Sequence, residues 1–212
     1  MRRSVIVGTG SYLPERVLTN AELSTMVDTS DEWIASRTGI RERRICHCNF
    51  SDMAIVAARR ALAAADLDPS ELDLILLGSL TMDTLCPNTA SLVADALGAR
   101  NAAALDINSA CTGFLYGLHI GTNLIKTGAH KKVLVIGGEF ISHYMNWSRR
   151  DVAVLFGDAC GAVVLEATDN FEPFIRQFAL DMRDENATIQ PYTSDVITYG
   201  ETSNPGAYCV VN

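Results

Sequence analysis

Residues 72–78 read Leu-Asp-Leu-Ile-Leu-Leu-Gly, an almost unbroken apolar run that is typical of a β-strand buried on both faces of a sheet. Further strands are expected at 5–8, 102–107, 133–137 and 161–165. Because segments of helical composition separate these runs, the pattern predicts βαβ units with right-handed crossovers. The chain is therefore predicted to fold into α/β layers around a mostly parallel or mixed sheet.

Capping residues predict where the helices begin and end. Ser30 is a predicted N-cap, followed by acidic residues and closed by Gly39. Ser51 is predicted to cap a longer Ala-rich helix that runs to about Ala65. The other two helices are expected at 89–97, closed by Gly98, and at 111–127, closed by Gly128. The inner side of the last helix is predicted to carry Phe114, Leu115, Leu118, Gly121, Leu124 and Ile125.

The charge and the N-terminal sequence exclude several classes of protein. A formal net charge of -8 argues against nucleic acid as a partner, because a phosphate backbone is bound by clustered Lys and Arg. The first residues lack the order of a signal peptide, and no stretch is long enough to span a bilayer. We therefore expect a cytoplasmic protein with no membrane contact, whose six cysteines are free thiols.

Cys111 lies where a predicted strand turns into a long helix, within residues 106–114, DINSACTGF. The unpaired N–H groups and the positive end of the helix dipole stabilise a thiolate, which is the nucleophilic form of cysteine. Small neighbours let a substrate carbonyl approach the backbone closely, as an oxyanion hole of N–H groups requires. An arbitrary cysteine is more often a small packed hydrophobe. At this elbow, the context favours a nucleophile.

Other motifs predict less. Cys46-His47-Cys48 has a spacing too tight for a zinc knuckle and no second ligand pair, and it is interpreted as a surface loop. Gly8-Thr9-Gly10 begins like a dinucleotide fingerprint, but the third glycine is missing and Pro14 follows. No metal site or cofactor is predicted. Of the four histidines, only His119 shares a helix with Cys111, so the sequence supplies no evident general base.

Five motifs occur in one order along the chain: GTGSYLP at 8–14, TSDEWI at 29–34, RTGIRER at 37–43, SACTGF at 109–114 and FGD at 156–158. Together, from about Arg3 to Thr168, they closely resemble the β-ketoacyl-acyl carrier protein synthase III family of the thiolase-like superfamily. The resemblance implies a thiolase-like α/β/α fold with a mixed five-stranded sheet and helices on both faces. It further implies that the chain corresponds to the N-terminal half of a duplicated fold.

The resemblance also implies a reaction. An acyl-CoA substrate acylates Cys111, malonyl-acyl carrier protein loses carbon dioxide, and the resulting carbanion attacks the acyl-enzyme. Trp33 and Arg150 match the positions whose side chains enclose the CoA adenine. The other residues at substrate-binding positions are Thr29, Arg37 and Thr38 for the CoA phosphates and ribose, and Cys86 and Phe156 for the acyl group. A homodimer, formed through the strand near Leu105 and the segment around Cys86, is implied as well.

This sequence departs from the family pattern in three respects. Cys86 is small where the family often has a bulky aromatic, so we expect a primer longer than acetyl. Asp151 replaces a residue that is usually small, beside Arg150, which could tilt the adenine site. Residues 1–170 match the N-terminal domain, and 171–212 are expected to lead toward a C-terminal domain that this chain lacks. The family's catalytic His and Asn belong to that domain, so residues 1–212 alone are expected to have no condensing activity.

Two other functions fit the same residues. One is a related enzyme that uses the same cysteine elbow, such as a thiolase, an HMG-CoA synthase, or an acyltransferase or ketosynthase of secondary metabolism. The other is a non-catalytic module that dimerises and binds acyl-CoA, in which Cys111 only packs. In that second case the thiol would be unreactive toward iodoacetamide at neutral pH while CoA still bound.

Overall fold

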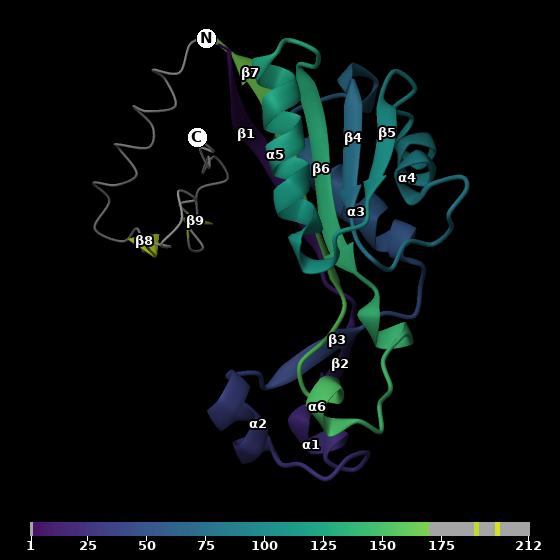
Figure 1. The fold of residues 1–212 in the computed structure, drawn as a ribbon, viewed down its shortest axis with the longest axis vertical. Coiled ribbons are helices and arrows are strands. Elements are labelled where there is room, and N and C mark those ends of the chain that lie inside the picture. Colours follow the sequence, from purple (N-terminus) through teal and green to yellow (C-terminus); the bar gives the residue numbers. More distant parts are fainter. Residues whose placement is uncertain (1, 170–188, 191–197, 200–212) are drawn as a thin grey trace.

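The computed structural model describes residues 2–169, 189–190 and 198–199 of the 212-residue chain. Five strands form one sheet with the order β1-β7-β6-β4-β5 (Figure 1). They are β1 Arg3–Tyr12, β4 Leu74–Gly78, β5 Ala103–Ile107, β6 Lys132–Glu139 and β7 Ala159–Thr168. Strand β4 runs parallel to both β5 and β6, whereas β7 runs antiparallel to β6 and β1. The predicted mixed five-stranded sheet is confirmed.

Helices cover both faces of this sheet (Figure 1). Helices α3 (Phe50–Ala64) and α4 (Thr89–Leu97) cover one face, and α5 (Gly113–Lys126) covers the other. Strand β4 contributes to both cores, because Ile75 and Leu77 pack on the α3 side while Leu74 and Leu76 pack on the α5 side. The alternation of a strand accounts for this division. The apolar run at 72–78 is thus buried on both faces, as predicted.

A small additional layer, besides the sheet and the helices on its two faces, lies beyond one end of the sheet (Figure 1). Its elements are β2 Arg16–Thr19, β3 Glu42–Ile45, α1 Asn20–Leu23, α2 Asp31–Thr38 and α6 Arg150–Ala153. Strands β2 and β3 pair antiparallel, and the layer has its own buried core of Leu18, Leu23, Val27, Ile34, Ala153 and Val154. This layer brings residues near position 30 together with residues near position 150.

The remaining described elements are short. Three-residue 3-10 helices occur at η1 Pro69–Glu71, η2 Ala110–Thr112 and η3 Ile141–His143, and β8 Ile189–Gln190 pairs antiparallel with β9 Thr198–Tyr199. Apart from β8 and β9, the extended segment predicted at 171–212 lies outside the described residues, so the predicted division into domains stays untested. Within the described parts, the helices are too short or too polar to cross a bilayer.

Strand β1 is longer than the strand predicted at 5–8. It pairs with β7 as far as Tyr12 and Cys160, although the local sequence resembles a turn. Its glycines serve close packing: a methyl group on Gly8 or Gly10 would stand within 2.3 Å of a carbonyl oxygen of α3. The Gly8-Thr9-Gly10 motif therefore lets α3 pack closely against β1. In a nucleotide-binding fold, the corresponding glycines would instead form a loop after the strand.

Two details of the predicted helices are wrong. Asn49, rather than Ser51, caps α3, in a capping box with Asp52, and Ser51 is buried in the first turn. Leu115 was expected on the inner side of α5, but its side chain is 57% exposed. The face against the sheet is built instead from Gly117, Leu118, Gly121, Thr122 and Ile125.

Candidate active site

The elbow around Cys111 joins the end of β5 to the start of α5. After Ile107 the chain turns through Ala110, which has a positive φ of 48°, into the 3-10 turn that contains Cys111. Thr112 stabilises this turn, because its hydroxyl donates to the carbonyl of Ser109 at 2.8 Å. The predicted strand-to-helix elbow is present, with the difference that the α-helix itself begins two residues after Cys111.

Glycines let the elbow pack against the carboxyl ends of the strands. A methyl group on Gly78, the last residue of β4, would stand 2.3 Å from the carbonyl carbon of Gly113. A methyl group on Gly137 of β6 would stand 2.6 Å from Cβ of Phe114. Side chains at either position would push α5 away from the sheet. The glycines therefore fix the height of Cys111 above the strand ends.

The side chain of Cys111 is exposed, and no hydrogen bond to it occurs within the described residues. His119, on the same helix, is exposed and bonded to Asn123, with His Nε2 and the Asn amide nitrogen 3.3 Å apart. His130 lies near Asp73, and His143 stacks with Phe140. In the described part of the molecule, none of these three histidines is bonded to the Cys111 thiol.

Two carboxylates that the site prediction did not include organise the strand ends. Glu139, at the end of β6, accepts hydrogen bonds from the hydroxyls of Ser79 and Thr81 and from the amide of Leu80. It thereby fixes the loop after β4, which begins beside the elbow. Glu139 directly follows Gly137 and Gly138 at the end of a buried strand. A charged residue at that place in the sequence could have indicated a functional or structural role at the strand end.

The second carboxylate is Asp158, which is buried just before β7. It accepts from the amide of Cys46 at 2.7 Å and from the amide and hydroxyl of Ser142 at 2.9 and 2.5 Å. The FGD motif at 156–158 contains this residue, but the site prediction named only Phe156. Three donors on one buried carboxylate connect β7 to the linker after β3 and to η3.

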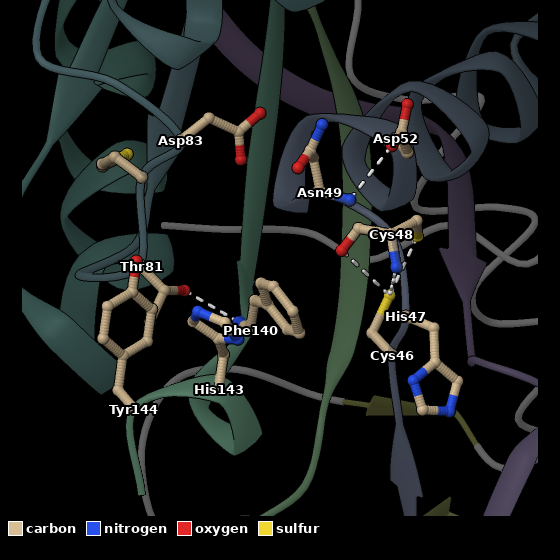
Figure 2. A pocket seen from close by; sticks show the side chains of 11 residues that line it. Cys46, His47, Cys48, Asn49, Asp52, Thr81, Asp83, Phe140, His143 and Tyr144 are labelled. Atoms are coloured by element: carbon tan, nitrogen blue, oxygen red, sulfur yellow. Dashed lines mark hydrogen bonds between the residues drawn. The ribbon is translucent and has the colours of Figure 1, made fainter.

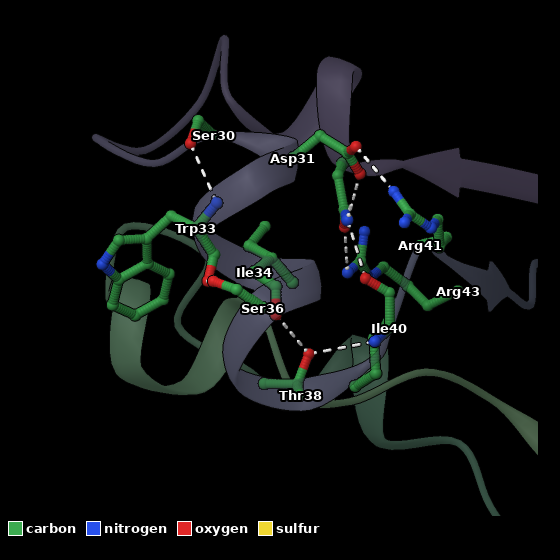
Figure 3. A network of polar contacts seen from close by, with 10 residues as sticks. Ser30, Asp31, Trp33, Ile34, Ser36, Thr38, Ile40, Arg41 and Arg43 are labelled. Atoms are coloured by element: carbon green, nitrogen blue, oxygen red, sulfur yellow. Dashed lines mark hydrogen bonds and ion pairs between the residues drawn. The ribbon is translucent and has the colours of Figure 1, made fainter.

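Two guanidinium groups contact the ring of Trp33. The guanidinium carbon of Arg37 is 4.4 Å from the centre of the Trp33 ring, and that of Arg150 is 4.8 Å away. The hydroxyl of Ser30 accepts from the amide of Trp33 at 3.1 Å, which fixes the first turn of α2 (Figure 3). Arg150 is held further by a bond to the carbonyl of Asp28 at 3.1 Å. Residues distant in sequence thus form one exposed, cationic aromatic surface.

The two threonines beside this surface have different environments. Thr38 donates to the carbonyl of Ile34 at 2.8 Å and accepts from the amide of Ile40 at 3.1 Å, so it closes α2 (Figure 3). The hydroxyl oxygen of Thr29 is buried, and no partner for it exists among the described residues. Of the two, Thr29 is the one with a free hydrogen-bonding group.

The hydrogen bonds of the Asp151 carboxylate go to Arg149, although Arg150 is close enough for an electrostatic interaction. The carboxylate pairs with Arg149 at 3.1 Å to Nε and 2.5 Å to the terminal nitrogen. The hydrogen bond from Arg149, together with the positive charge of that guanidinium, holds the pKa of Asp151 below its usual value. The guanidinium of Arg150 lies over the ring of Trp33, and whether Asp151 alters the adenine site stays a prediction.

The remaining predicted residues lie on the surface. Cys86 is exposed in the loop between β4 and α4, and Phe156 is 39% exposed before β7. No hydrogen bond or ring contact within the described residues connects Cys111 with the group around Trp33. The structure therefore assembles the Trp33 group and the cysteine elbow separately.

Comparisons with known proteins identify the family that this chain resembles. Residues 105–183 match the family model described as 3-oxoacyl-[acyl-carrier-protein] synthase III. A β-ketoacyl-[acyl-carrier-protein] synthase III 2 of Vibrio vulnificus is 54% identical over 164 residues, which are 77% of this chain and 45% of that protein. A related synthase III of Desulfitobacterium hafniense is 50% identical over 80% of this chain and 52% of its own length.

Solved structures give the same result. The crystal structure of 3-oxoacyl-[acyl-carrier-protein] synthase III from Aquifex aeolicus is similar with a TM-score of 0.77 and 50% identity, over 79% of this chain and 55% of that one. The priming β-ketosynthase of the R1128 polyketide pathway matches with a TM-score of 0.77 and 37% identity, over 80% of this chain and 51% of its own. The chain spans about half the length of the relatives it matches.

Proposed function

Because this chain belongs to the 3-oxoacyl-[acyl-carrier-protein] synthase III family and spans about half the length of its relatives, we propose that Cys111 accepts an acyl group from an acyl-CoA thioester. The observation that carries the proposal is the exposed thiol at an elbow that glycine contacts hold against the ends of β4 and β6. An exposed nucleophile at a helix N-terminus suits an attack on a carbonyl carbon.

The acyl transfer proceeds in two bond changes. The Cys111 thiolate attacks the thioester carbonyl, and the negative charge that develops on oxygen is stabilised by backbone N–H groups at the start of α5. The carbon–sulfur bond to CoA then breaks, and CoA leaves as a thiolate that takes up a proton from water. The acyl group remains on the Cys111 sulfur as a new thioester.

We assign CoA binding to the surface around Trp33. An indole ring already contacted by two guanidinium groups is suited to a planar, electron-rich adenine and to nearby phosphates. The buried, unpartnered hydroxyl of Thr29 gives this region one further hydrogen-bonding group. The hydroxyl of Thr38 already makes two hydrogen bonds, so we propose that Thr38 holds the end of α2 in place beside the bound CoA.

Condensation with malonyl-acyl carrier protein is the second step that we propose for the family site. The carbanion left after loss of carbon dioxide would attack the Cys111 thioester, giving a 3-oxoacyl-acyl carrier protein and the free thiol. That step needs a hydrogen-bond donor to the malonyl carbonyl, and no histidine bonds to Cys111 in the described residues. We expect residues 1–212 by themselves to support acyl transfer with little or no condensation.

Intact mass spectrometry tests the acyl transfer. The purified protein is incubated with acetyl-, butyryl- and octanoyl-CoA, and a mass increment of one acyl group per chain is expected. Cys111→Ala should abolish the increment, whereas Cys86→Ala should keep it. An unchanged mass with every thioester, from a protein that still binds CoA, would exclude acyl transfer and favour the non-catalytic binding module.

The acyl-CoA series also tests the length of the primer, and analytical ultracentrifugation tests the assembly. Cys86 is small and exposed beside Leu85, which is 98% exposed, and β5 lies at the sheet edge with Leu105 half-exposed. We propose that these residues face a second copy and that Cys86 leaves room for a primer longer than acetyl. Acylation by acetyl-CoA alone would contradict the longer primer, and a monomer in analytical ultracentrifugation would contradict the dimer.

A further inference from the structure

The linker between β3 and α3 carries two thiols that acyl transfer does not use. The sulfur atoms of Cys46 and Cys48 lie 2.9 Å apart (Figure 2). The Cys46 sulfur also contacts the backbone of Cys48, whose amide donates to it at 3.4 Å. The backbone thus folds back on itself so that the two side chains meet. The sequence suggested a surface loop, but Cys46 is buried, with 5% of its side chain exposed, and Cys48 is half-buried.

This pair lines an open cavity of about 600 Å³ (Figure 2). Thr81, Phe140 and Tyr144 lie across the cavity from the thiols. A cavity of this size admits a small molecule to the half-buried sulfur of Cys48. Within the described part of the chain, no three His, Cys, Asp or Glu side chains are grouped so that they could hold a metal ion. Two thiols in contact, without a third ligand, are better suited to thiol–disulfide exchange than to zinc.

We propose that Cys46 and Cys48 are a redox-active dithiol that closes to an intramolecular disulfide by exchange with a small-molecule disulfide such as glutathione disulfide. The Cys48 thiolate attacks one sulfur of glutathione disulfide, whose S–S bond breaks and releases one glutathione. Cys46 then loses its proton and attacks the Cys48 sulfur, which releases the second glutathione. Two electrons and two protons pass from the protein to the oxidant.

The geometry of the linker supports closure. A disulfide bond of about 2.05 Å requires the two sulfurs to approach by roughly 1 Å. The linker is fixed at both ends, by the bond from the Cys46 amide to Asp158 at 2.7 Å and by that from the Asn49 amide to Asp52 at 3.0 Å. Between these points His47 is exposed and belongs to no regular element, so its backbone can take up the change.

Peptide mapping provides a direct test. Trypsin releases residues 45–59 as one peptide that contains Cys46 and Cys48 and no other cysteine. Cys111→Ala protein, which lacks the proposed nucleophile, is equilibrated with millimolar reduced and oxidised glutathione, starting from both the reduced and the oxidised state. Free thiols are then trapped with an alkylating reagent. The use of this variant separates the result from the outcome of the acyl-transfer experiment.

We expect the peptide to lose two hydrogen atoms and to carry no glutathione. The closed disulfide should exceed the mixed disulfide by about tenfold or more, because the adjacent thiol has an effective concentration above that of millimolar glutathione. In Cys46→Ser, the half-buried Cys48 should carry glutathione instead, whereas in Cys48→Ser the buried Cys46 should stay reduced. Two results would overturn the proposal. In one, the peptide that retains both cysteines gains glutathione without closing. In the other, it stays reduced after Cys86 is fully glutathionylated.

Discussion

Gly78 at the end of β4 and Gly113 at the start of α5 touch backbone to backbone. A methyl group on Gly78 would stand 2.3 Å from the carbonyl carbon of Gly113, and one on Gly113 would stand 2.9 Å from Cα of Gly78. A strand and the helix that follows the cysteine elbow can approach this closely only where both residues lack a side chain. The position of Cys111 over the sheet depends on this contact.

Gly78→Ala is expected to destabilise the protein and displace the elbow. The added methyl group meets backbone atoms that cannot rotate away, so we expect a loss of about 1–3 kcal/mol in the free energy of unfolding, measured in urea. Gly161→Ala is the matched control, because the nearest atoms to its added methyl group are 3.9 Å away. Equal stability of the two variants would mean that the elbow can move without cost.

Asp158→Ala is expected to cost about 2–5 kcal/mol, because it removes the acceptor of buried amides at Cys46 and Ser142. Thermal and urea unfolding measure the change. Asp151→Ala serves as the control for loss of a carboxylate, since Asp151 is exposed and its carboxylate bonds to the neighbouring, exposed Arg149. If both variants unfolded like the wild type, the amides would have found other acceptors.

Substitutions around Trp33 should weaken CoA binding. Trp33→Ala removes the ring, and Arg150→Met removes one of its two cations while keeping the length of the side chain. A cation–π contact at an exposed site contributes about 0.5–1 kcal/mol, so Arg150→Met should raise the Kd for CoA by about two- to fivefold, as measured by calorimetry. Arg59→Met, on the exposed side of α3, should bind CoA like the wild type.

The cysteines should react with iodoacetamide in a defined order. Burial raises the pKa of Cys160 to about 12, and burial together with a hydrogen bond between the Cys48 thiol and Cys46 raises the pKa of Cys48 to about 12. A raised pKa lowers the thiolate fraction at neutral pH, so these two thiols should react slowly and about tenfold faster with each unit of rising pH. The exposed Cys111 should be labelled first at pH 7. Labelling of Cys48 as fast as that of Cys111 would contradict this order.

Closure of the Cys46–Cys48 disulfide should alter the fluorescence of Trp147. The Cys46 amide bonds to Asp158, which also holds Ser142, and the Trp147 indole donates to the carbonyl of Ser142 at 3.0 Å. Emission is recorded in a Trp33→Phe background, where Trp147 is the remaining tryptophan. Cys48→Ser under the same oxidising conditions is the control. Identical spectra before and after closure would show that Asp158 isolates Trp147 from the linker.

Several features of this protein are encoded locally and were predictable from the sequence. The apolar run at 72–78 specifies a strand buried on both faces because every residue of such a strand meets a helix. The N-cap at Ser30 and the C-cap at Gly39 set α2, since capping depends on side chains a few residues apart. The elbow at Cys111 follows from small residues between a strand and a helix. The five ordered motifs also indicated the family.

Only the tertiary structure decided which distant residues meet. Pairing with β7 extended β1 through a sequence that locally resembles a turn, because hydrogen bonds along the ladder outweigh turn propensity. Burial fixed the role of Asp158, whose donors lie 16 and more than 100 positions away in sequence. The contact of Arg150 with Trp33 and the meeting of Cys46 with Cys48 likewise depend on how the backbone folds in space. Local sequence patterns cannot predict such contacts, because these join residues that only the folded backbone brings close together.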